Sequence, residues 1–452
     1  DILNAFCEAK IFGRTDEERE RFAPRSQLVT ELVRLMRKLK RDNFLRDELH
    51  DFSAEWSKAL LERELTRSPY LQLLDEGVLM ETPIAEEWGR FRRIVGYQVR
   101  FAFDPLFEFL LSNELLAEGG GWKGLTGEKV AKWLSEGRDF DHLTGAVTLL
   151  LTEAVQEGNL SLVAETLNAA DIELARPVIV EVLTTLEGLK DERFEPLLDE
   201  LAKKVDGEKA LTVLVSASYQ FGIKRRYRPA LACTERAEQL ARYLVEIKGQ
   251  KELANGLVAA LVNKGNVLSH LGYLEEAFVC NEEAIWICRH LVEEGQKELA
   301  KNLVIALGNK GTVLSQLNRL SEALDCYEEA VRICQHLVEV EGQRDLINEL
   351  ARALMNKGIA LWRLGHLEEG LDCLQKAIRV YWCLVKEGRR EAAYGLAMAL
   401  ESQGDALSNS GRLIEAIYCY EEAIGIYRYF VEEGWRELAN DLTWALVKRV
   451  RH

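Results

Sequence analysis

Apolar residues recur at helical spacing through the second half of this chain, with polar residues between them. In one stretch they fall at Leu253, Leu257, Leu261, Leu268 and Leu271. Separations of three, four and seven residues place these side chains on one face of an α-helix. The same ladder returns at residues 299–317 and again at 346–364. The pattern therefore predicts amphipathic helices that repeat along the chain.

The repeat has a fixed period of 46 or 47 residues. The phrase Leu-Val-Glu begins at Leu244, Leu291 and Leu337, and variants of it begin at Leu384 and Phe430. The spacings between these starts are 47, 46, 47 and 46 residues. A period of a few tens of residues is typical of stacked supersecondary units, which usually bind partners rather than perform chemistry.

Each unit is predicted to be a pair of helices joined by a short turn. Glycine or asparagine marks the turn, which suits a left-handed helix end; the turn residues are Gly272, Asn318, Gly365 and Gly411. A glycine also lies inside each first helix, where it costs about 1 kcal/mol relative to alanine; these are Gly265, Gly311, Gly358 and Gly404. Small residues seven apart follow in each second helix, as at Ala277 and Ala284. We expect close packing of the two helices to compensate for the glycine.

The first and last units depart from this plan. Arg225 stands where the other units have their turn glycine or asparagine, although Ala230 and Ala237 keep the register. The last unit is a single helix with Leu438 and Leu442, which we expect to cap the terminal apolar face.

The small-residue pattern resembles the tetratricopeptide repeat, whose usual length is 34 residues. About a dozen additional residues here, such as 290–303, lengthen both helices. The resemblance covers residues 208–452 and implies a right-handed α-solenoid of five helical hairpins and a capping helix. It also implies a concave surface, lined by the first helix of each pair, that recognises a protein or peptide.

Residues 1–118 lack this period and are predicted to form a winged-helix-like domain with a small β-hairpin. A helical run begins at Ser26, a second helix covers about 53–64, and strands are expected at 77–80 and 97–103. The connection between these strands, which contains Arg90, Arg92 and Arg93, would be the wing. Residues 119–207 read as an α-helical connector, so that the whole chain is expected to be mainly all-α.

The sequence VRFAFDPLFEFL at 99–110, with LLDEGVL at 73–79 before it, resembles the end of the winged-helix domain of STAND or NACHT signalling ATPases. That resemblance implies an NTPase core upstream of Asp1 or in a partner, because this chain has no phosphate-binding loop motif. Any ATP or ADP would bind in that core, and an effector domain could also lie upstream. Many members place a nucleotide-sensing histidine where this chain has Phe103 and Asp104.

The composition of the chain limits the kinds of partner that we expect it to bind. A net charge of −16 argues against general binding of nucleic acid. A basic helix with Arg34, Arg37 and Lys38 could contact phosphates, could contact an acidic neighbouring domain, or could present a solvated face. No apolar run is long enough to span a bilayer. Nine cysteines without zinc-ligand spacing suggest a reducing cytoplasm.

We find no catalytic arrangement, and we expect no cofactor, no metal and no enzymatic activity in this chain. Cys233, Cys280, Cys326, Cys373 and Cys419 share one repeat position. Packed helices lie about 10 Å apart, which is too far for these thiols to share one ion or form disulfides. We interpret them as buried core thiols.

The candidate partner-binding residues are the exposed positions that follow each interior glycine. They are Asn266, Ser269, His270, Thr312, Ser315, Gln316, Ile359, Trp362, Arg363, Asp405, Ser408 and Asn409. Trp362 and Arg363 are residue types enriched in binding hot spots. The alternative for Trp362 is packing against a neighbouring repeat.

Three hypotheses follow from the sequence. The first is a non-catalytic sensor and regulatory region of a STAND-type signalling protein, with a defence role implied by resemblance alone. The second is a free-standing adaptor that scaffolds an effector enzyme. The third is a transcription regulator with its winged helix on DNA and its solenoid as a ligand sensor.

Overall fold

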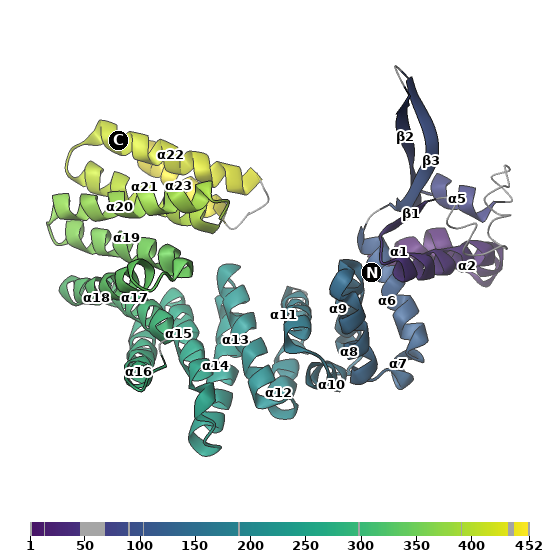
Figure 1. The fold of residues 1–452 in the computed structure, drawn as a ribbon, viewed down its shortest axis with the longest axis horizontal. Helices are drawn as coiled ribbons and strands as arrows, with labels where there is room; N and C mark the ends of the chain where they lie inside the picture. Colours follow the sequence, from purple (N-terminus) through teal and green to yellow (C-terminus); the bar gives the residue numbers. More distant parts are fainter. Residues whose placement is uncertain are drawn as a thin grey trace. The chain divides into compact units, whose positions relative to one another are not determined.

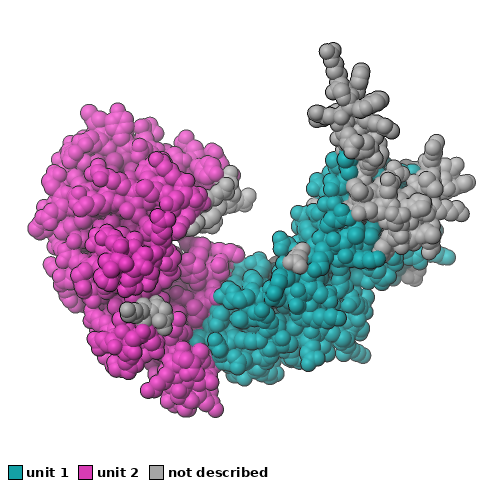
Figure 2. Space-filling model, in the orientation of Figure 1, with its two compact units in different colours: residues 1–213 teal, residues 214–452 magenta. Residues whose placement is uncertain are grey.

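The computed structural model of the chain describes residues 2–12, 14–45, 68–88, 91–102, 104–188, 190–296, 299–389, 391–432 and 438–450. It divides into two compact units, Asp1–Val213 and Leu214–His452 (Figure 2). The expectation of a mainly α-helical chain that contains repeated helical hairpins is confirmed. The predicted division into three domains stays a prediction.

The N-terminal unit begins with two helices and a small sheet. In chain order its first elements are α1 (Ile2–Cys7), the π-helix η1 (Glu8–Phe12), α2 (Asp16–Leu39), β1 (Asn43–Leu45), α5 (Pro69–Asp75), β2 (Leu79–Trp88), β3 (Phe91–Phe101) and α6 (Asp104–Glu118). The strands pair antiparallel in the order β1-β3-β2 (Figure 1). Strand β1 is an element that the sequence pattern did not predict.

Helix α2 begins ten residues before the start predicted at Ser26. Its first turn is fixed by a capping box, because the Glu18 amide donates to Thr15 Oγ1 at 3.2 Å. The Glu18 carboxylate in turn accepts from the Thr15 amide at 3.4 Å. These bonds satisfy amide groups that the helix leaves unpaired, and Pro24 is accommodated inside the helix.

The two strands of the hairpin are longer than predicted. Strand β2 runs to Trp88 and β3 starts at Phe91, so most of the expected wing is itself β-structure, and Arg92 pairs in register with Glu87. A register shift between Ile84 and Ala85 interrupts the ladder. The helix predicted at 53–64, Arg90 and Phe103 lie outside the described residues.

Helices fill the remainder of the N-terminal unit. They are α7 (Gly121–Gly124), α8 (Gly127–Glu136), η2 (Gly137–Asp139), α9 (Asp141–Gln156), α10 (Ser161–Ala169), α11 (Ile172–Gly188) and α12 (Phe194–Lys204). Their inward faces carry buried leucine and valine, such as Leu151 and Val182. In the described residues no helix has the length and apolar character that a bilayer span requires.

The chain from α13 (Gly207–Ile223) onward is a stack of helical hairpins (Figure 1), and the boundary between the two units falls within α13. The hairpins are α13 (Gly207–Ile223) with α14 (Tyr227–Arg242), α15 (Ala254–Leu271) with α16 (Leu274–Glu293), α17 (Ala300–Gln316) with α18 (Leu320–Glu339), α19 (Ile347–Arg363) with α20 (Leu367–Lys386), and α21 (Glu391–Asn409) with α22 (Leu413–Glu432). Helix α23 (Ala439–Val450) follows the last hairpin and packs on α22. Short helices η3 (Tyr243–Ile247), η4 (Lys251–Leu253) and η6 (Arg344–Leu346) lie in connections between hairpins.

The turn residues adopt the predicted left-handed conformation. Gly272, Asn318, Gly365 and Gly411 have φ angles of 87°, 61°, 95° and 79°. The interior glycines permit the expected close contact of paired helices: a Cβ on Gly311 would lie 2.6 Å from the Tyr327 ring of α18. On Gly358 a Cβ would lie 2.8 Å from the carbonyl oxygen of Gly370 in α20. The interior glycines therefore bring the two helices of these hairpins into close contact.

Candidate functional site

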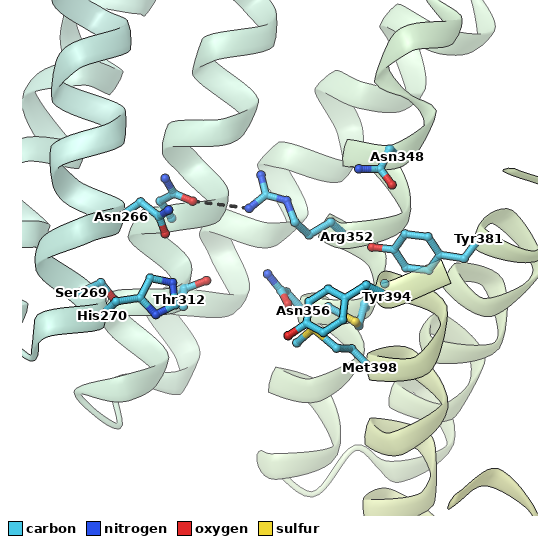
Figure 3. Close-up of a pocket in the computed structure, with 13 residues that line it drawn as sticks. Asn266, Ser269, His270, Thr312, Asn348, Arg352, Asn356, Tyr381, Tyr394 and Met398 are labelled. Atoms are coloured by element: carbon cyan, nitrogen blue, oxygen red, sulfur yellow. Dashed lines mark hydrogen bonds between the residues drawn. The ribbon is translucent and has the colours of Figure 1, made fainter. Parts of the chain in front are cut away.

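The first helices of four consecutive hairpins, α15, α17, α19 and α21, together with α20, surround a pocket of about 330 Å³. Side chains of α15 and α17 face those of α19 and α21 across it (Figure 3). The lining residues are Asn266, Ser269, His270, Asn309, Thr312, Asn348, Arg352, Met355, Asn356, Tyr381, Tyr394, Gly395 and Met398. The pocket lies wholly within the C-terminal unit.

Several carboxamide groups in the pocket have no protein partner. Among the described residues, the side chains of Asn266, Asn348 and Asn356 make no hydrogen bond. Asn266 is exposed, and Asn348 and Asn356 are half-buried. Each carboxamide offers two donor hydrogens and one acceptor oxygen. The pocket thus presents unused donors and acceptors from α15 and α19.

The charge of the pocket is balanced within the protein. Arg352 donates to Glu349 through Nε at 2.9 Å and Nη2 at 2.6 Å, and its Nη1 lies 3.4 Å from Asn309 Oδ1. Burial opposes the charge of Arg352, but Glu349 raises the pKa of the guanidinium, which stays a cation. Both bonds go to one oxygen of the Glu349 carboxylate, Oε2, so the charge of Arg352 is neutralised within the protein.

Aromatic and thioether side chains form the rest of the pocket lining. Tyr381 is buried, which raises the pKa of its hydroxyl, and Met355 is 5% exposed. His270 stacks on Tyr227 with ring centroids 4.6 Å apart. Burial, with Arg225 nearby, lowers the pKa of His270, so the ring is neutral at pH 7. Flexible methionine beside tyrosine suits varied apolar side chains.

Four of the predicted partner-binding residues line this pocket, namely Asn266, Ser269, His270 and Thr312. Predicted residues also connect neighbouring first helices: Ser269 of the pocket donates to Gln316 Oε1 at 2.8 Å, and Arg363 donates to Ser315 Oγ at 2.9 Å.

The remaining predicted residues lie away from the pocket lining. Asp405 accepts from Tyr420 at 2.9 Å and from Lys448 of α23 at 2.8 Å. Asn409 is exposed and donates to the Asp405 carbonyl at 2.8 Å. Ile359 and Ser408 are half-buried. Their role in partner binding stays a prediction.

Trp362 packs within its own hairpin. A Cβ on Gly370 would lie 2.9 Å from the Trp362 amide nitrogen and 3.0 Å from its Cβ. The indole Nε1 is buried and has no hydrogen-bond partner in the described part of the chain. Packing inside the hairpin is thus one role that the structure gives to this side chain.

The asparagines that lie before the interior glycines were not among the predicted site residues. Asn309 and Asn356 each begin an Asn-Lys-Gly triplet, as does Asn263 one repeat earlier. The lysine of each triplet pairs with an acidic residue of the preceding second helix; Lys264 lies 2.7 Å from Glu238, and Lys357 lies 3.0 Å from Glu328. This recurring triplet was the available signal for the asparagines.

The basic helix has acidic neighbours. Arg34 Nε donates to Glu114 of α6 at 2.6 Å, and Arg37 pairs with both Glu118 and Glu136. Arg34 and Arg37 thus pair with carboxylates of α6 and α8 in the same unit, whereas contact of this helix with phosphates or with a separate acidic domain stays a prediction.

Four of the five repeated thiols are buried in the core, as predicted. Cys233, Cys280, Cys326 and Cys373 are buried, and Cys419 is half-buried. One group of potential ligands does occur among the described residues, at Asp42, Asp104 and His142. There the His142 ring packs against Phe107 and Phe140 and lies 3.1 Å from a Glu108 oxygen. These contacts join α6 to α9, and we assign no metal to the group.

The fold and the pocket define the C-terminal unit as a solenoid of tetratricopeptide type. Two segments, residues 304–343 and 351–381, match the tetratricopeptide repeat family, so the chain contains tetratricopeptide repeats. No curated protein matches the sequence.

Solved structures with a similar fold include NprR in complex with its cognate peptide NprX, at 16% identity over 69% of this chain and 83% of that chain, with a TM-score of 0.41. Another is the Rap conjugation gene regulator of plasmid pLS20 in complex with the Phr* peptide, at 17% identity over 68% and 77%, with a TM-score of 0.40. A third is a STAND protein with a tetratricopeptide repeat sensor from Pyrococcus horikoshii, at 15% identity over 94% and 63%, with a TM-score of 0.36.

Proposed function

We propose that the C-terminal unit is a non-catalytic sensor that binds a peptide in the pocket between α15, α17, α19 and α21. The observation that carries this proposal is the set of free carboxamides at Asn266, Asn348 and Asn356. A peptide main chain presents an N–H donor and a C=O acceptor at each residue. A carboxamide matches both and is indifferent to the peptide's side chains.

The spacing of the helices fits an extended chain. Packed helices lie about 10 Å apart, and an extended peptide advances about 3.3 Å per residue. A peptide lying across successive first helices therefore meets a new helix at about every third residue. Met355, Met398 and Tyr394 would contact its side chains between these main-chain bonds.

The sequence resemblance gives this sensor a signalling context. In that context the N-terminal unit is a winged helix and connector that regulates an NTPase in an upstream domain, with the nucleotide bound there. Peptide binding would shift an existing equilibrium of the signalling protein by its difference in affinity for two states. The acidic partners of Arg34 and Arg37 make the DNA-reading alternative less favourable than the sensor.

The test is affinity selection with the full chain and a defined library of linear synthetic hexapeptides. Wild-type protein is expected to enrich a peptide subset. Replacing Asn266 and Asn356 together by alanine should weaken binding of that subset at least fivefold, since each lost hydrogen bond contributes about 0.5–1.5 kcal/mol.

A matched control is Asn302→Ala, on α17 but outside the pocket, where the side chain donates to Asn255 at 2.7 Å. This variant should bind like wild type. If wild type enriches no peptide, or if the double variant binds as tightly as wild type, the pocket is not the peptide site.

A further inference from the structure

The turn of the first hairpin has an unusual residue in a restricted conformation. Arg225 has a φ of 54°, at the place where the later hairpins have Gly272, Asn318, Gly365 and Gly411. Left-handed backbone at a long, non-glycine side chain is strained. Such strain persists where surrounding contacts hold the residue in place.

The contacts that hold Arg225 come from the other end of the hairpin stack. Its Nη2 donates to Asp441 Oδ2 of α23 at 2.6 Å and to the Tyr394 hydroxyl of α21 at 3.1 Å. Burial opposes the charge, but Tyr394 and Asp441 raise the pKa of Arg225 above its usual value. The first turn and the last helix of the stack, 216 residues apart in sequence, are thereby joined.

This junction borders the pocket described above. Tyr394, which accepts the bond from Arg225, lines the pocket. Tyr227, two residues after Arg225, stacks on His270, which also lines it. Arg225, Tyr227, His270, Tyr394 and Asp441 thus form a strap whose members come from both ends of the hairpin stack.

We propose that this strap closes the groove into a ring, so that the pocket accepts a short linear peptide with free ends rather than an internal segment of a folded protein. The proposal rests on the peptide-binding function. A peptide with a free end can thread through a closed ring as a single chain. An internal segment of a folded protein would have to enter the ring as a loop, with two lengths of chain side by side. The pocket volume, about 330 Å³, is at the small end of the range for ligand sites and has room for a few residues only.

The experiment compares two presentations of the same sequences to the full chain. One is the library of free hexapeptides; the other carries each hexapeptide within a surface loop of a folded carrier protein. Wild type should bind selected free peptides at least tenfold more tightly than their loop-embedded copies. Arg225→Gly, which keeps the left-handed turn without strain, and Asp441→Asn should each reduce that ratio toward one.

The matched control is Arg412→Ala, because Arg412 follows the turn Gly411 and pairs only locally, with Glu415 at 2.7 Å among the described residues. It should keep the wild-type ratio. Equal binding of both presentations by wild type would overturn the strap while leaving the peptide pocket intact, as would an unchanged ratio in both Arg225→Gly and Asp441→Asn. Absence of binding to either presentation would instead refute peptide binding itself, and the strap proposal with it.

Discussion

Gly358 provides a quantitative test of the close packing within the hairpins. An alanine Cβ at this position would lie 2.8 Å from the Gly370 carbonyl oxygen and 3.1 Å from the Leu374 amide nitrogen. Both are backbone atoms, so neither can rotate away as a flexible side chain would. Overpacking of this kind costs about 1–3 kcal/mol.

Substitution of a second helical glycine allows the free-energy cost of overpacking to be separated from the gain in helix propensity. Gly425 lies in α22, and a Cβ there would have no atom within 4 Å. Alanine gains about 1 kcal/mol over glycine in a helix interior, and both substitutions receive this gain. The difference in unfolding free energy between Gly358→Ala and Gly425→Ala therefore isolates the packing cost, about 1–3 kcal/mol.

Urea denaturation followed by circular dichroism measures this difference through the midpoint and slope of each transition. Gly425→Ala should unfold at higher urea than wild type, and Gly358→Ala at lower urea than Gly425→Ala. In a thermal scan the two variants should differ by about 2–4 °C per kcal/mol for a unit of this size. Equal stability of the two variants would refute the reasoning that close helix approach requires glycine at 358.

Three further outcomes are expected. A thiol reagent at pH 8 should modify exposed Cys383 before the buried thiols, since burial raises the pKa of Cys288 and Cys334 to about 12; mass spectrometry that finds either of the latter modified first would contradict this. Trp362→Phe removes a buried, unpaired N–H, so stability should be unchanged or slightly higher in the same urea assay; weaker peptide binding by this variant would instead mean that the indole contacts the ligand. Arg37→Ala should destabilise the N-terminal unit by up to about 1 kcal/mol, and less at high salt, because the lost pairs are partly exposed; a salt-independent loss would point to packing of the side chain.

The repeat architecture could be predicted because each hairpin obeys local rules. Gly272 and Asn318 mark left-handed turns through backbone chemistry alone, and Gly311 marks a close helix contact. Because these local signals recur at a fixed period, they predict that successive hairpins stack on one another. The predicted start of α2, Ser26, lies C-terminal to the observed start at Asp16, although Thr15 and Glu18 carry the capping-box signal.

The pocket could not be predicted from the sequence of a single repeat. Asn266 and Thr312 follow their glycines and were predicted, but Arg352 and Tyr394 enter the pocket from positions earlier in their helices. Which turn of each helix faces the pocket depends on how successive hairpins rotate relative to one another. That rotation results from packing along the whole stack, as does the contact of Arg225 with Asp441.

The most direct measurement is a crystal structure of the full chain with a peptide selected from the linear library. We expect the peptide main chain to lie within hydrogen-bond distance of the Asn266 and Asn356 carboxamides, in the pocket lined by α15, α17, α19 and α21. A peptide bound on the second helices, with both asparagines still unpaired, would contradict it.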